Sequence, residues 1–75
     1  MNQKELKDLM EKRNEKASEM EKMLELVKSE SRAFTDEEMT AFDTLEKAVK
    51  DYDKTIDAEE RARALRLDHE KRTGQ

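Results

Sequence analysis

The chain has 75 residues, of which 48% are charged, 33% are hydrophobic and 4% are aromatic, and its formal net charge is −4. A chain this short and polar has too little apolar surface for a conventional globular core. The absence of cysteine excludes disulfides and thiolate metal sites, and one glycine without any proline excludes a glycine-rich phosphate loop. We therefore expect long solvated helices in a soluble intracellular protein. We expect no membrane span, because no apolar run approaches about 20 residues.

Charge is distributed unevenly along the chain. Residues 1–32 carry eight basic and eight acidic side chains, residues 33–60 carry three basic and ten acidic, and residues 61–75 carry five basic and two acidic. Nucleic-acid binding needs a basic face, which the first two segments lack. The basic end is better explained as the favourable positive end of a helix, so we do not expect nucleic acid as a partner.

The first predicted element is a helix over residues 3–29. Its apolar positions recur alternately four and three residues apart, which places them on one side of an α-helix as a heptad seam. The single polar member is Arg13. We expect the seam of this helix to consist of Leu6, Met10, Arg13, Ala17, Met20, Leu24 and Val27.

The next predicted element is a turn at residues 30–34, followed by a helix cap. Thr35 and Glu38 have the spacing of a capping box, in which the hydroxyl accepts from the amide of Glu38 and the carboxylate accepts from the amide of Thr35. Phe34 before the cap and Met39 in the first turn have the spacing of a hydrophobic staple. Both patterns predict that a helix begins directly after Thr35.

The second predicted helix covers about residues 36–70. Apolar residues again recur three and four apart, and the pattern fades at Glu59 and Arg63. Gly74 is a candidate stop for this helix. We expect its seam to consist of Phe42, Leu45, Val49, Tyr52 and Ile56.

A short connection between two long helices predicts antiparallel neighbours, hence an all-α, two-helix hairpin that resembles a coiled coil. Folding at residues 30–34 gives a register in which facing residue numbers add up to about 66. Arg13 then faces Tyr52, and we expect the guanidinium to stack on the ring or to bond to the hydroxyl. About a dozen residues of the second helix are left without a partner helix.

The hairpin alone leaves apolar residues over, and this predicts association into a larger helical bundle. Leu9, Met23 and Leu26 are expected beside the seam, where they remain in contact with water. A second hairpin is the natural cover for such a widened apolar stripe. We therefore expect homo-oligomers.

Candidate catalytic and metal-binding patterns are weak. Asp51, Asp53 and Asp57 resemble the start of a calcium loop, but the glycine is absent and Ala62 stands at the twelfth position. His69 has no ligand partner at helical spacing. Two helices enclose no pocket in which a carboxylate could act as a general acid. We expect no enzymatic activity, no cofactor, no metal and no small-molecule substrate.

Two stretches resemble a known family. Met1-Asn2-Gln3-Lys4-Glu5-Leu6 and the helix that follows it resemble the opening of major capsid proteins of tailed phages of the Hong Kong phage type. Residues 32–38 (Arg-Ala-Phe-Thr-Asp-Glu-Glu), residues 42–46 (Phe-Asp-Thr-Leu-Glu) and Ile56-Asp57 are similar to that family's pattern Arg-x-Leu-Thr-x-Glu-Glu, Phe-Asp-x-Leu-x-x-Glu and a later Ile. Phe34 replaces the usual Leu, and Glu59 stands near the place of a common Arg.

The resemblance covers about residues 1–65 and only the N-terminal delta domain of such capsid proteins, which implies that this chain is part of a longer capsid protein. In the family this domain acts as a built-in scaffold on the inner face of the procapsid, in the host cytoplasm, and a prohead protease removes it where the phage has one. The implied partners are other capsid subunits and the protease. The alternative that the residues leave open is a generic coiled-coil adaptor of a cellular complex. A nucleic-acid-binding hairpin using residues 61–72 is a weaker third reading.

Overall fold

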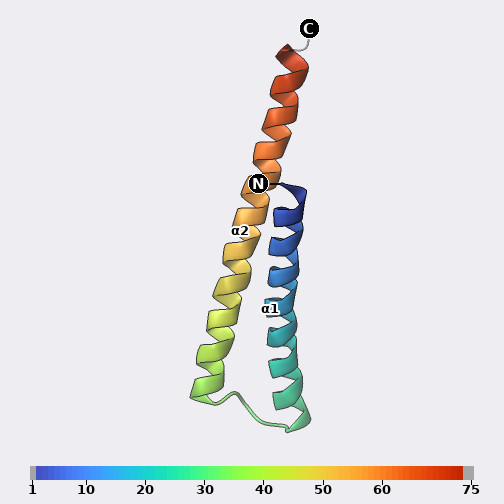
Figure 1. Ribbon diagram of the computed structural model, residues 1–75. Coiled ribbons are helices and arrows are strands. Elements are labelled where there is room, and N and C mark those ends of the chain that lie inside the picture. The colour runs from blue at the N-terminus through green and yellow to red at the C-terminus, as the bar shows by residue number, and fades with distance from the viewer. Residues whose placement is uncertain (1, 74–75) are drawn as a thin grey trace.

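The computed structural model describes residues 2–73, with side chains for residues 2–66. Two antiparallel helices, α1 (Gln3–Ser29) and α2 (Asp36–Thr73), lie side by side and are joined by one short connection (Figure 1). The molecule measures 64 × 17 × 15 Å. The predicted all-α hairpin is confirmed, and the helix bounds agree with the predicted ranges 3–29 and 36–70 to within three residues. Gly74 lies outside the described residues.

Helix α1 begins directly after Asn2, an N-cap residue that the spacing of apolar residues did not predict. The side chain of Asn2 accepts a hydrogen bond from the amide of Glu5 at 2.8 Å. Asn is a preferred N-cap residue because its oxygen satisfies an amide that has no partner within the helix. A Glu three residues after the cap also places negative charge at the positive end of the helix dipole.

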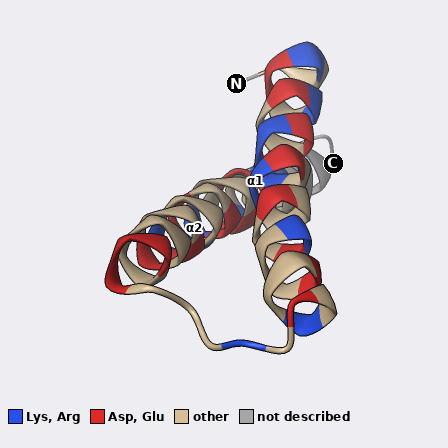
Figure 2. Cartoon of the chain, turned by 90° about the horizontal axis from the view of Figure 1, so that it is seen from below, with Lys and Arg blue, Asp and Glu red and all other residues tan. Residues whose placement is uncertain are grey.

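Helix α2 is the longer of the two and extends past the start of α1, so that its last turns have no neighbouring helix (Figure 1). Its first turn contains Asp36, Glu37 and Glu38, which complement the helix dipole. Figure 2 shows these acidic residues at the beginning of α2 and the alternation of acidic and basic residues along α1.

The contact between the helices is narrow, and most of its side chains are only half-buried. Among the described side chains, the buried apolar ones are Leu6 and Val27, each 8% exposed. They lie near opposite ends of α1, so the contact runs along nearly its whole length. Neither helix, over the described side chains, is long and apolar enough to cross a membrane.

Candidate functional site

The connection between the helices is a built turn that holds both helix ends. The amide of Arg32 donates to the carbonyl of Val27, and the amide of Ser31 donates to the carbonyl of Lys28, both at 3.1 Å. This pair of bonds is a Schellman motif, which needs a left-handed residue after the helix. Ser31 fills that position with φ 52°. Ser31 stands where glycine is usual, so the turn at residues 30–34 was predictable but this motif was not.

The start of α2 carries the predicted capping box. The amide of Glu38 donates to Oγ1 of Thr35 at 3.1 Å, and the amide of Thr35 donates to Oε1 of Glu38 at 2.9 Å. Two backbone amides that α2 cannot pair internally are thereby satisfied. This prediction is confirmed in both directions of the hydrogen bonding.

Arg32 joins the same structure by a bidentate ion pair. Its Nη1 and Nη2 donate to Oε1 and Oε2 of Glu38 at 2.7 and 3.0 Å, Nη1 also donates to the carbonyl of Ala33, and Nε donates to Glu30. The hydrogen bonds from Arg32, then that from the amide of Thr35, lower the pKa of Glu38 to about 2. The same carboxylates raise the pKa of Arg32. The connection is thus fixed by charge as well as by backbone geometry.

Phe34 packs against an aromatic ring of α2. Its ring lies 5.4 Å from the ring of Phe42, with the two planes tilted by 41°. Phe42 lies about one turn beyond Met39, which is 42% exposed. The staple between Phe34 and Met39 stays a prediction. An aromatic pair also adds favourable edge and face contacts.

The seam of α2 is where the sequence placed it, since Phe42, Leu45, Val49, Tyr52 and Ile56 are all half-buried. The pattern continues past Ile56, because half-buried positions recur three and four residues further along. These later positions are Glu59, Ala62 and Arg63.

Of the seven residues predicted for the seam of α1, five are buried or half-buried. Leu6, Arg13, Met20 and Val27, which are spaced by seven residues, are buried or half-buried as predicted. Of the remaining members, Ala17 is half-buried, whereas Met10 and Leu24 are 37% and 38% exposed. The side chains that fill this part of the contact are Leu9, Lys16 and Met23.

Leu9 and Met23, which were predicted beside the seam, are half-buried, and Met10 and Leu24 are the two predicted seam residues that are more exposed. The residues within each row are seven positions apart. The row of Met10, Ala17 and Leu24 lies one position after the row of Leu9, Lys16 and Met23. The helix turns by about 100° per residue, so the two rows flank the same line on opposite sides. Leu26 is exposed as predicted, at 46%.

Arg13 fixes the register of the two helices. Its Nε donates to Oδ1 of Asp53 at 2.9 Å, and Nη1 donates to the side chain of Asn14 at 3.4 Å. The contact between Arg13 and Asp53 matches the predicted register, in which facing numbers add up to about 66. The predicted partner, Tyr52, is wrong by one residue: the carboxylate next to the phenol takes the guanidinium, because a charged acceptor binds it more strongly.

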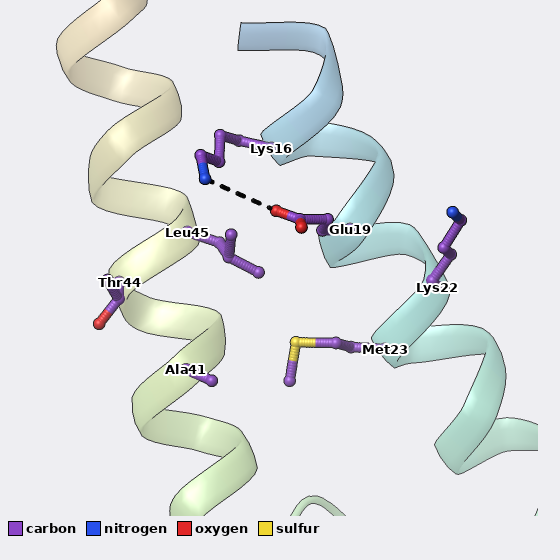
Figure 3. A pocket seen from close by; sticks show the side chains of 7 residues that line it. All are labelled: Lys16, Glu19, Lys22, Met23, Ala41, Thr44 and Leu45. Atoms are coloured by element: carbon purple, nitrogen blue, oxygen red, sulfur yellow. Dashed lines mark ion pairs between the residues drawn. The ribbon is translucent and has the colours of Figure 1, made fainter. Parts of the chain in front are cut away.

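A shallow groove of about 610 Å³ runs between the helices near the connection (Figure 3). Figure 3 shows Leu45 and Met23 pointing into it from opposite helices, and an ion pair of 3.9 Å between Lys16 and Glu19 along its rim. The remaining lining residues are Lys22, Ala41 and Thr44. The groove has an apolar floor and a charged rim on the α1 side, which suits contact with another helix better than chemistry on a small molecule.

The three aspartates of the calcium-like pattern are held apart. Asp53 binds Arg13, Asp51 binds Lys47 at 3.4 Å, and Asp57 binds Arg61 at 2.7 Å. Within the described part of the chain, no group of three His, Cys, Asp or Glu side chains is placed to hold a metal ion. His69 lies beyond residues 2–66, for which the structure describes side chains.

Sequence reasoning missed Ser31, Arg32 and Asp53. The acidic partner of Arg13 could have been found from the register, because Asp53 completes the sum of 66. The bond between Arg32 and Glu38 joins the connection to the first turn of α2, and no spacing rule of a regular helix predicts such a pair. Comparison of the chain with protein-family models, with curated proteins and with solved structures found no match.

Proposed function

We propose that this chain is an assembly domain that acts through helix contacts, of the kind found at the N-terminus of tailed-phage capsid proteins. One observation carries the proposal: a folded hairpin keeps large apolar side chains in water. Met10, Leu24, Leu26 and Met39 are each between 37% and 46% exposed, and Leu65 is 70% exposed. Covering such side chains with further helices releases about 25 cal/mol per Å² of apolar area.

The residues of the family-like motif support this reading because they form one local structure. Arg32, Thr35 and Glu38 are joined by hydrogen bonds, and Phe34 contacts Phe42. These five motif residues thus help to fix how the connection meets the start of α2. A rigid connection keeps the outer faces of both helices in a defined arrangement, which helix-mediated assembly requires.

The proposed action has no catalytic step. Many copies are tethered on the inner face of a growing procapsid in the host cytoplasm, and their local concentration is high. Weak contacts between hairpins are then sufficient to guide subunit geometry. Weak contacts also suit a scaffold that is later removed, by a prohead protease where one is present.

The test uses the full reading frame that encodes this chain. We expect the frame to continue after Gln75 into a shell-forming domain. Expression of the full protein is expected to give closed shells of uniform diameter by electron microscopy. A version lacking residues 2–73 is expected to give irregular or open assemblies. A frame without a shell domain, or uniform shells from the deleted version, would contradict the proposal.

The groove favours a second candidate function, a coiled-coil adaptor that binds one partner helix. Its apolar floor of Met23, Ala41 and Leu45 is open along the hairpin (Figure 3). The genes beside this one separate the two functions. Portal, prohead protease and large terminase genes are expected for the assembly domain, and genes of a cellular complex are expected for the adaptor.

A further inference from the structure

The connection between α1 and α2 contains no residue that forbids a helix. Residues 30–35 read Glu-Ser-Arg-Ala-Phe-Thr, and the one glycine of the chain is Gly74. Proline stops a helix because it lacks an amide donor, and glycine stops one because it readily takes the left-handed conformation. Ser31 takes that conformation here, with φ 52°, at the steric cost of its Cβ. The turn is therefore held by the contacts of the connection and not by a residue that could form nothing else.

Seam residues of α1 recur in α2 at a spacing of 22 residues. The pairs are Met20 with Phe42, Met23 with Leu45, and Val27 with Val49. Twenty-two residues are two 11-residue repeats, which make six turns at about 3.67 residues per turn, close to the 3.6 of an α-helix. Ser31 and Phe34 stand halfway between the members of the first two pairs. A helix that continued straight through the connection would therefore keep both seams on one side.

The register of the hairpin is symmetric about residue 33. Arg13 contacts Asp53, and their numbers add up to 66, which is twice 33. Two copies with continuous helices could lie antiparallel, with residue 33 of each on a twofold axis. Each residue of α1 would then meet the same residues of α2 as in the hairpin, now supplied by the other copy. The bond between Arg13 and Asp53 would form twice, once on each side of the axis.

We propose that two copies of this chain exchange their helices and form such a dimer. Residues 3–73 of each copy become one helix about 105 Å long, at about 1.5 Å per residue, and α1 of each copy packs on α2 of the other. The contact between the helices is kept, and only the connection changes. Exchange of an identical element between copies needs no new surface, so the concentration of the chain decides which form is populated.

The change in the connection involves a loss and a gain. The continuous helix loses the capping box of Thr35 and Glu38 and the ion pair between Arg32 and Glu38. It gains helical hydrogen bonds for residues 30–35, and Ser31 leaves the left-handed region. Both terms belong to residues 30–38, so substitutions there shift the exchange without altering the contact between the helices.

The exchange goes beyond the proposed function and does not depend on it. Met10 and Leu24, which are 37% and 38% exposed in the hairpin, stay exposed in the exchanged dimer because the same seam is formed. These side chains remain available for assembly with further helices. Loss of the exchange would therefore leave an assembly domain made of closed hairpins.

Two substitutions in the connection test the exchange because they shift it in opposite directions. Ser31→Gly suits the left-handed position of the hairpin and weakens the continuous helix. Each copy contributes about tenfold, so the dimer is expected to dissociate about 100-fold more readily. Thr35→Ala removes the cap of the hairpin and favours the continuous helix, so the dimer is expected to be about 100-fold tighter. Sedimentation velocity from micromolar to millimolar concentration measures both changes.

The matched controls are Ser18→Gly and Thr40→Ala. Both residues lie within helices in the hairpin and in the exchanged dimer, so these substitutions are expected to leave the dissociation constant unchanged. Circular dichroism checks that every variant is folded. A dimer that responds to neither connection substitution consists of closed hairpins and overturns the exchange, while self-association in the proposed function would stand.

A distance within one chain tests the exchange directly. The chain has no cysteine, so Lys12→Cys with Lys54→Cys places two spin labels at exposed positions. The two positions are level in the hairpin, where the labels are expected within about 30 Å because packed helices lie about 10 Å apart. In the exchanged dimer they are separated by 42 residues of one helix, which is about 60 Å at about 1.5 Å per residue.

The labelled chain is mixed with a tenfold excess of unlabelled chain, so that pulsed electron resonance measures distances within one chain. At millimolar concentration we expect the distance of about 60 Å, and at micromolar concentration the short one. A short distance in samples that have the mass of a dimer overturns the exchange, as does a chain that stays monomeric. Shell assembly by the full protein judges the proposed function separately.

Discussion

At the residue scale, Ser31 is the most strained position in the connection. Its φ of 52° lies in the left-handed region, which costs a residue with a Cβ about 1–2 kcal/mol relative to its preferred conformations. Glycine populates this region freely. Ser31→Gly is therefore expected to raise the free energy of unfolding by about 1 kcal/mol, measured by urea titration followed by circular dichroism.

Ser18→Gly is the matched comparison for this substitution. Ser18 lies in the interior of α1 on its exposed side, where glycine is expected to cost about 0.5 kcal/mol relative to serine. Opposite signs for the two serines are the expected result. If both substitutions destabilise the hairpin, the left-handed geometry of Ser31 is wrong.

Thr35 tests the cap of α2. Removing its hydroxyl leaves the amide of Glu38 without its acceptor, and Thr35→Ala is expected to lower the free energy of unfolding by about 1 kcal/mol. Thr40→Ala is the control, because the Thr40 hydroxyl bonds back to the carbonyl of Asp36 within the helix. Its loss is expected to be neutral or slightly stabilising, since alanine is the better helix former. Equal effects of the two substitutions would show that the Thr35 hydroxyl does not stabilise α2 as a cap.

Glu38 makes stability depend on pH. Its pKa is lowered from 4.5 to about 2 in the folded chain, chiefly by Arg32, so the unfolded state binds the proton more tightly. The stabilisation is present above about pH 4.5 and is lost as the pH falls toward 2. Glu38→Gln is expected to flatten the pH profile of the melting temperature between pH 5 and pH 2.

The control for this profile is Glu37→Gln, which removes the same charge from the same helical turn. In Glu38→Gln the new side chain still fits a capping box, so Glu38→Gln loses the ion pair with Arg32 but keeps the cap. Glu37→Gln loses neither. Identical profiles for the two variants would show that the pair with Arg32 contributes nothing to acid sensitivity.

The sequence predicted these local structures unequally. The capping box was predictable because Thr35 and Glu38 obey a fixed spacing that backbone geometry imposes. The Schellman motif was not, because its signal is a glycine and this chain uses Ser31. The bridge from Arg32 depends on how the connection folds back toward α2, which no local pattern records.

At the element scale, the seam of α2 was predictable and that of α1 only in part. On α2 the large apolar residues from Phe42 to Ile56 lie in two adjacent rows spaced by seven residues and leave no choice of seam. On α1 the row with Met10, Ala17 and Leu24 is wholly apolar, whereas the row that fills the contact includes Lys16. A lysine can lie along an apolar contact with its methylene stem while its charge stays in water. The absence of charged residues from a row was therefore the wrong criterion for choosing the row of α1 that faces α2.

Comparing neighbouring residues tests this correction. Leu9 is half-buried against α2, and Leu9→Lys is expected to lower the free energy of unfolding by about 1 kcal/mol, roughly half the value of a fully buried leucine. Met10→Lys alters a more exposed side chain and is expected to cost less than about 0.5 kcal/mol. Both values are measured by urea titration. A larger loss for Met10→Lys than for Leu9→Lys would show that the predicted seam with Met10 is correct.

At the scale of the whole molecule, the hairpin is long and thin, 64 Å by 17 Å, and most of its seam is only half-buried. Such a shape exposes most of its surface, so further burial must come from other chains. The composition indicated this from the start, because a charged 75-residue chain cannot enclose its own apolar residues. Which residues stay exposed depended on the pairing of the two helices, and spacing misplaced two of them.

We propose that this hairpin works by associating with itself. Sedimentation equilibrium of the 75-residue chain from micromolar to millimolar concentration, with circular dichroism on the same samples, tests this self-association. Self-association predicts a folded helical chain whose average mass rises with concentration from that of a monomer toward that of a dimer. A folded chain that remains strictly monomeric over the whole range would contradict it.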